Sequence, residues 1–391
     1  MSLSNGRAYL AIPGPSVIPD AVLRAMHRAS PNIYEGELHD LTQSLIPDLK
    51  TVARTDHNVA IYIGNGHAAW EAALANVLSR GDTVLVLATG RFCIGWGEMA
   101  AGLGADVQTI DYGAQAPIDL ALVEQALVAD TAGRIKAVLA VHVDTSTSVK
   151  NDVPGLRALL DKTGHPALLM VDCIASLGCD QFEMDAWGVD VMVAACQKGL
   201  MTPAGISFVW YGPKADAARG NCVTTYWDWR PRSAPEMYFQ YFDGTAPTHH
   251  LYGLRAALNI ILAEGLDHVF WRHETLARAI WAAFDQWSKT GAMRLNILDP
   301  AHRSHAVTSV EIGSPDGDRL RHWCEHQAGL TLGIGLGRSP SDAYFRLGHM
   351  GHVNAQMIMG LLGTIEAGLT ALGIAHGRGA LDAAADVIAA A

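Results

Sequence analysis

Seven short apolar segments, most of them separated by helical patterns, occupy residues 58–212 of the chain. Segments that are apolar along their whole length are typical of buried strands in a parallel sheet, because helices cover both faces of such a sheet. We therefore expect an α/β fold with a large, mostly parallel seven-stranded sheet. The expected strands are Val59–Ile63, Thr83–Ala88, Val107–Tyr112, Ala137–Val143, Ala167–Val171, Val189–Ala195 and Ile206–Tyr211.

A different pattern begins near residue 290, where strands and helices alternate over shorter distances. This pattern predicts a smaller C-terminal α+β domain. A long helical stretch before it is expected to join the two domains. The predicted elements of the small domain are strands at 306–312 and 344–347 and helices at 316–326 and 355–372.

Residues 11–19 are too rich in proline for a helix or a central strand. They indicate an extended arm that covers a site or reaches a partner subunit; a plain N-terminal loop is the alternative. The predicted division of the chain is an arm of residues 1–20, a large domain of residues 21–265 and a small domain of residues 266–391.

Composition excludes several classes of function. The chain has 391 residues, of which 50% are hydrophobic, and a net charge of −11. Such an acidic chain is a poor partner for nucleic acid. Its 17 histidines and six cysteines show no metal-binding spacing and no CxxC motif, so we expect no metal and reduced thiols. Without a signal segment or a long apolar run, the sequence predicts a soluble, cytoplasmic protein without membrane contact.

Lys198 stands just after the apolar run Val189–Ala195. An amine at the end of a buried strand must leave water, and desolvation lowers its pKa. Such an amine is a nucleophile for carbonyl groups, which is the chemistry of a Schiff base. The alternative is a lysine that extends to the surface after an ordinary core strand.

Other polar groups follow the expected strands, where ligands bind in open α/β sheets. Asp172 ends an apolar run and needs a partner, either a protonated ring nitrogen or an arginine. Gly64–His67 opens a helix whose free N–H groups suit a phosphate, or it forms a plain tight turn. Phe92 provides a flat aromatic surface, although core packing is an alternative. Arg346 ends a strand and matches a carboxylate.

An amine nucleophile, an aspartate, an anion-binding helix start, an aromatic ring and an arginine are the groups that pyridoxal phosphate requires. At these residues, and from Pro13 to Gly351 overall, the chain resembles the class V aminotransferases of the alanine/serine/aspartate–glyoxylate group. The resemblance implies the type I fold of pyridoxal-phosphate enzymes. Its most specific pieces are Gly64–Ala73, the turn at Asp172, Gln197-Lys198, Thr245-Ala-Pro with Leu251–Arg255, and the segment around Arg346.

The resemblance also implies a role for each matching residue. Lys198 and Asp172 are expected to be catalytic, as the Schiff-base lysine and the partner of the pyridine nitrogen. Arg346, with Gly14 and Tyr34, is expected to bind substrate. The expected cofactor contacts are Asn65, Gly66, His67 and Gln197 at the phosphate, Phe92 on the ring, Thr145 at the phenolic oxygen, and Thr245 from the second subunit of a homodimer.

The implied reaction moves an amino group from serine, alanine or aspartate to glyoxylate, giving glycine and a 2-oxo acid. An aspartate donor needs a second cation, for which Arg230, Arg232 and Arg338 are candidates. One alternative is a lyase or desulfurase of the same fold, which needs a mobile cysteine, whereas Cys324 lies in a helical pattern. The other is a non-catalytic regulator that binds pyridoxal phosphate.

The chain departs from the family pattern at four places, one of which is the turn after Asp172, where Cys-Ile-Ala-Ser replaces Ala-Val-Ser-Ser. Ser30–Tyr34 replaces a His-Arg-Ser motif, and Phe242 stands where a phosphate-binding tyrosine is usual. The aromatic stretch Tyr226–Arg232 has no counterpart that assigns it a role.

Overall fold

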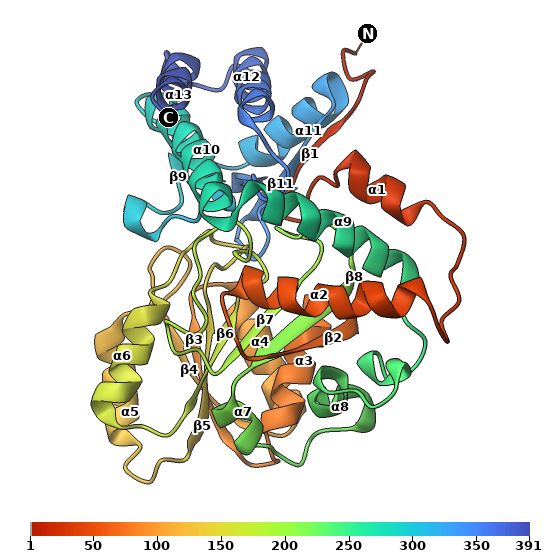
Figure 1. The fold of residues 1–391 in the computed structure, drawn as a ribbon. Helices are drawn as coiled ribbons and strands as arrows, with labels where there is room; N and C mark the ends of the chain where they lie inside the picture. The colour runs from red at the N-terminus through yellow and green to blue at the C-terminus, as the bar shows by residue number, and fades with distance from the viewer. Residues whose placement is uncertain (1) are drawn as a thin grey trace.

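The computed structural model describes residues 2–391 and contains a large seven-stranded sheet, as predicted. The strand order is β2-β8-β7-β6-β5-β3-β4, in which β8 runs antiparallel to β2 and β7 and every other pair is parallel (Figure 1). The strands are β2 (Asn58–Gly64), β3 (Thr83–Ala88), β4 (Asp106–Asp111), β5 (Ile135–Val141), β6 (Leu168–Asp172), β7 (Val191–Ala195) and β8 (Gly205–Tyr211).

Helices cover both faces of this sheet, and the strand residues alternate between two cores. Val59 and Ile61 pack into one core, whereas Ala60 and Tyr62 pack into the other. This double burial explains why the inner strands β3, β5, β6 and β7 are largely apolar, whereas the edge strand β4 is exposed or half-buried along its length. The first face carries α2 (Glu37–Ala53), α5 (Leu120–Ala129), α6 (Val153–Thr163) and α9 (Thr248–Glu264), and the second carries α3 (Gly66–Val77), α4 (Arg91–Gly102), α7 (Pro213–Ala217) and α8 (Trp229–Ser233).

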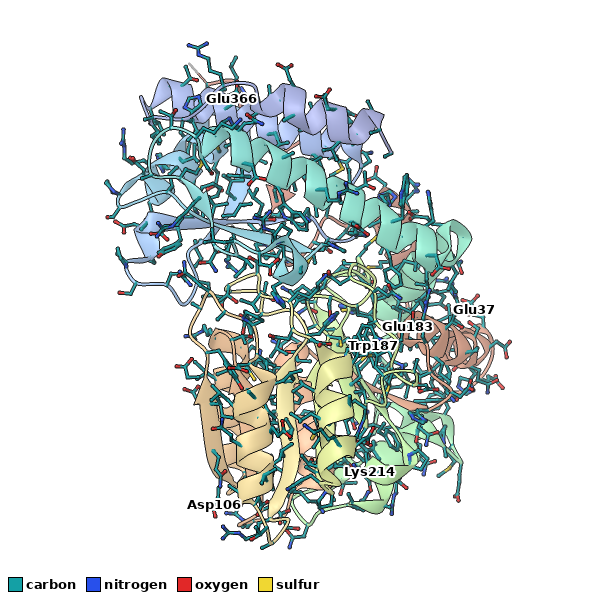
Figure 2. All side chains as sticks on the ribbon, turned by 90° about the vertical axis from the view of Figure 1, so that its left-hand side faces the viewer. Glu37, Asp106, Glu183, Trp187, Lys214 and Glu366 are labelled. Atoms are coloured by element: carbon teal, nitrogen blue, oxygen red, sulfur yellow. The ribbon has the colours of Figure 1, made fainter. Side chains whose placement is uncertain are left out.

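A second, five-stranded sheet has the order β1-β11-β12-β10-β9. Long helices pack on it around a third core (Figure 1). In Figure 2 Asp106 marks the far edge of the large sheet, and Glu366, on α12, marks the opposite end of the molecule. The elements are β1 (Tyr9–Ala11), β9 (Arg294–Leu295), β10 (Val307–Glu311), β11 (Leu330–Ile334), β12 (Tyr344–Gly348), α10 (Leu266–Trp287), α11 (Asp316–Ala328), α12 (Ala355–Ala371) and α13 (Ala380–Ala389).

Strand β1 was not predicted. It lies in the predicted arm and pairs in parallel with β11, with Leu10 opposite Thr331. Its three residues precede the prolines, so no periodic pattern could form there. The arm thus belongs to the second sheet through β1, while the division of the chain at residue 265 stays a prediction.

The remaining elements are short. Among residues 2–391, no helix has both the length and the apolar composition required to cross a membrane. The aromatic stretch Tyr226–Arg232, whose role the sequence left open, lies in two short helical segments, Thr225–Trp227 and Trp229–Ser233. The elements are α1 (Asp20–Met26) and the 3-10 helices η1 (Thr225–Trp227), η2 (Tyr238–Tyr241), η3 (Pro300–His302) and η4 (Ser341–Ala343).

Candidate active site

A cavity of about 170 Å³ lies at the carboxyl ends of the large sheet's strands. Loops that follow β2, β3, β5, β6 and β7 converge there, as expected for ligand sites in α/β sheets. Eight residues proposed from the sequence line it: Asn65, Gly66, His67, Phe92, Thr145, Asp172, Gln197 and Lys198. Trp70, Val143 and Ile174 complete the lining.

Lys198 lies three residues after β7, and its side chain is turned into the protein rather than to the surface. The residue is only 9% exposed. Burial, with a smaller effect from the charge of Arg346, lowers the pKa of the Lys198 amine to about 8. The amine donates a hydrogen bond to the carbonyl of Pro13. Gly14 follows at a positive φ of 99°, and a Cβ there would overlap the lysine side chain.

Asp172 is the last residue of β6 and is buried. Its carboxylate accepts hydrogen bonds from the Ile174 N–H at 2.6 Å and from the Trp70 indole N–H at 2.8 Å. Burial nevertheless raises the pKa of Asp172 to about 7. Trp70 was missed by the sequence reasoning, although it lies on α3 only four residues after Gly66.

The start of α3 faces the same cavity. Asn65 caps the helix, since its side chain accepts the His67 N–H at 3.1 Å. The ring of His67 lies over Trp70, and burial lowers the pKa of His67, which favours a neutral imidazole. The side-chain oxygen of Gln197 is buried and accepts no hydrogen bond from any described residue. The helix start therefore offers polar groups to a ligand.

Phe92 is held in the cavity wall by a carboxylate from a residue that is distant in the sequence. Helix α4 starts at Arg91, and the residue before it, Gly90, provides no side-chain cap. Asp144, in the loop after β5, accepts the Phe92 N–H at 3.0 Å, and Ser146 accepts the Arg91 N–H at 3.1 Å. Burial raises the pKa of Asp144. The sequence reasoning missed this long-range cap, which fixes the start of α4.

Arg346, on β12, approaches the cavity from the second sheet. Its guanidinium donates to the carbonyl of Thr145 at 2.7 Å and to that of Ile334 at 2.7 Å. Burial lowers the pKa of Arg346 to about 10, while the charge of Asp144 acts in the opposite direction. The bond to Thr145 places the guanidinium beside the cavity lining.

Two of the proposed site residues lie away from this cavity within their own chain. Tyr34 is 85% exposed, and Thr245 is also exposed. Phe242, which replaces the usual tyrosine, is fully buried in the first core. Its ring therefore contributes to packing and offers no polar group to a ligand.

Comparison with known proteins identifies the family of this site. The family described as aminotransferase class-V matches residues 8–353. The chain belongs to the class V aminotransferases. The serine–glyoxylate aminotransferase of Methylorubrum extorquens is 37% identical over 384 residues, covering 94% of this chain and 92% of that protein. The L-aspartate–glyoxylate aminotransferase of Paracoccus denitrificans is 34% identical, covering 93% and 91%.

Solved structures agree with this assignment. A ureidoglycine–glyoxylate aminotransferase from Bacillus subtilis superposes with a TM-score of 0.89 at 25% identity and covers 99% of this chain and 100% of that one. The expected fold class and the expected kind of enzyme are therefore confirmed.

The cofactor of this aminotransferase family is pyridoxal 5′-phosphate, and the residues of the cavity fit it. Asp172 is a buried carboxylate whose charge a protonated ring nitrogen would stabilise. The start of α3 lines the cavity, and the dipole of this helix favours an anionic group such as the phosphate. The Gln197 amide lines the same cavity. Lys198 provides an amine of lowered pKa for the aldehyde.

Proposed function

We propose that this class V aminotransferase moves the amino group of a small L-amino acid to glyoxylate, giving glycine and a 2-oxo acid. The observation that carries the proposal is the small cavity lined by Lys198 and Thr145, with the Arg346 guanidinium bonded to the carbonyl of Thr145 beside it. The relatives named above are glyoxylate aminotransferases, which supports glyoxylate as the acceptor.

Pyridoxal phosphate supplies an aldehyde that exchanges amines and a ring that accepts an electron pair. Lys198 takes the α-proton of the donor as a general base, for which a pKa of about 8 is suitable near neutral pH. Asp172 would keep a proton on the ring nitrogen of the bound cofactor. Arg346 binds the substrate carboxylate, and glyoxylate offers little else to bind.

The three candidates for a second cation are engaged elsewhere in the chain. Arg230 pairs with Asp216 at 2.7 Å on the surface. Arg232 is buried and donates to backbone carbonyls, and Arg338 donates to the Ala114 carbonyl and lies over the ring of Tyr344. We therefore propose serine or alanine, rather than aspartate, as the donor.

A homodimer with shared sites is part of the proposal. Thr245 is exposed in its own chain, which suits a residue that contacts the cofactor phosphate of a partner subunit. Exposed Tyr34 suits the same placement.

The desulfurase alternative lacks a nucleophile in this site. Within the described chain, no cysteine lines the cavity, and Cys324 is buried in the core of the second sheet. A desulfurase needs a cysteine that reaches the substrate, so the transaminase is the better supported function.

A series of donors tests the proposal, with glyoxylate as the fixed acceptor and glycine as the measured product. Serine and alanine should exceed aspartate by at least about tenfold in kcat/KM, because aspartate would bury an unpaired carboxylate. Lys198→Ala is the matched control and should form no glycine with any donor. Equal rates for aspartate and alanine would contradict the donor assignment. A wild type that binds pyridoxal phosphate but reacts with no amino acid would instead support the alternative of a non-catalytic regulator.

A further inference from the structure

The segment Ile12–Ser16 crosses the site between two parts of the chain that are far apart in sequence. On one side it holds the peptide of the catalytic lysine. The Ser16 hydroxyl donates to the Lys198 carbonyl at 2.7 Å, and the Ser16 N–H donates to the Gln197 carbonyl at 2.9 Å. In return, the Lys198 amine donates to the Pro13 carbonyl. Three hydrogen bonds thus join this segment to Gln197 and Lys198.

On its other side the segment lies against the strands that carry Arg346. A Cβ on Gly348, the last residue of β12, would overlap the Ile12 carbonyl oxygen. A Cβ on Gly333 of β11 would lie 2.7 Å from Pro13 Cδ and 3.2 Å from Arg346 Cβ. Only residues without side chains allow an approach this close.

The two ends of the segment are fixed to different sheets. Strand β1 ends at Ala11, just before the segment, and is paired with β11 of the second sheet. The other end, Ser16, is 5% exposed and is bound to the turn after β7 of the large sheet. The only other donor to the Lys198 carbonyl among the described residues is the Met201 N–H, at 3.0 Å, which belongs to the same turn. Ser16 therefore links this turn to the second sheet, beside the bond from the Lys198 amine to Pro13.

We propose that Ser16 is a positioning residue for Lys198, and that Ile12–Ser16 sets the place of the lysine amine relative to the guanidinium of Arg346. The proposal rests on the proposed function, since it takes Lys198 as the base and Arg346 as the carboxylate-binding group. Without the Ser16 hydroxyl, the turn loses its side-chain bond to the arm. The lysine then leaves the Pro13 carbonyl and reaches water more often.

The first test measures the Lys198 amine in the cofactor-free protein. Its acetylation by acetic anhydride is followed across a range of pH by peptide mass spectrometry. Ser16→Ala should move the midpoint of the acetylation titration to higher pH, because a more hydrated amine holds its proton more tightly. An unchanged titration would overturn the proposal.

A matched control separates positioning from general stability. The hydroxyl of Thr42, on α2, donates to the Leu38 carbonyl at 2.8 Å and is also buried. Thr42→Val should lower stability without moving the lysine titration, and an equal movement in both variants would contradict the proposal. Ser16→Cys keeps a weaker donor of similar size and should give an intermediate titration; it carries the test if Ser16→Ala does not fold.

The second test uses the holoenzyme. Ser16→Ala should lower kcat by about tenfold, the effect of about one lost hydrogen bond on a proton transfer. KM for glyoxylate should change less than about twofold, since Arg346 keeps its bonds to Thr145 and Ile334. A change in KM alone would contradict the proposal. Because the acetylation titration needs no substrate, it still tests Ser16 if the proposed reaction is wrong.

Discussion

At the scale of single residues, Asp172 shows how burial prepares a group for a partner. Its pKa of about 7 lies above the ordinary value of 3.8, because burial penalises the carboxylate. Between pH 3.8 and about 7, the carboxyl of Asp172 is therefore protonated in the folded, cofactor-free protein and ionised in the unfolded chain. The free energy of unfolding then falls as pH rises from about 4 to about 7, and the loss is complete above that range.

The variant Asp172→Asn should lack this pH dependence. Relative to the wild type, its free energy of unfolding should rise with pH by up to about 4 kcal/mol, which corresponds to the difference between the two pKa values. Urea unfolding of both cofactor-free proteins at several pH values measures the difference.

A matched control is Asp180→Asn. Burial would raise the pKa of Asp180, but the charges of His305 and Lys150 outweigh it and lower the pKa, so this variant should lose stability relative to the wild type as pH rises. Parallel profiles for wild type and Asp172→Asn would contradict the expectation.

At the scale of elements, the start of α4 depends on a carboxylate from another loop. One oxygen of Asp144 accepts the Phe92 N–H and the other accepts from the backbone and hydroxyl of Ser146. Asp144→Asn turns one of these oxygens into a donor, so one set of bonds is lost. We expect weaker binding of pyridoxal phosphate by about tenfold and a loss of about 1–3 kcal/mol in unfolding free energy.

Asp119→Asn makes the same chemical change at the N-cap of α5, where Asp119 accepts the Ala121 N–H at 2.9 Å. This cap is exposed and far from the cavity lining, so cofactor affinity should not change. Equilibrium titration of each variant with pyridoxal phosphate, followed by absorbance, measures the affinity. Equal affinity for Asp144→Asn and wild type would show that the start of α4 does not depend on this cap.

The sequence predicts helices and strands better than it predicts contacts between residues that are far apart in the chain. The inner strands of the large sheet were predictable, because burial on both faces leaves a nearly continuous apolar run, which the exposed edge strand β4 lacks. Residues at strand ends, such as Asp172 and Lys198, could be selected as candidates for the site, because burying a charged side chain there is costly unless a partner compensates. The Trp70–Asp172 bond spans 102 positions and the Ser16–Lys198 bond 182, so no local pattern encodes them. Strand β1 was missed because its partner, β11, lies more than 300 residues away.

At the scale of the whole molecule, the exposure of Thr245 leads to a prediction about how two subunits share an active site. If Thr245 binds the cofactor phosphate of the partner, the site of one chain contains Lys198 from that chain and Thr245 from the other. Homodimers of Lys198→Ala should be inactive, and homodimers of Thr245→Ala should show little activity at limiting pyridoxal phosphate. A hybrid dimer of the two variants, however, contains one site with both residues intact.

Refolding an equal mixture of the two variants should therefore restore up to about one quarter of the wild-type activity, since half of the dimers are hybrids and half of their sites are intact. The measurement is glycine formation at limiting cofactor, before and after refolding, with each variant refolded alone as a control. If Thr245 served the site of its own chain, every site would lack one of the two residues, and the mixture would show only the mean of the two variants. Only hybrid dimers with shared sites can raise the activity above that mean. The same measurement therefore tests whether the protein is a dimer and whether each site contains residues from both subunits.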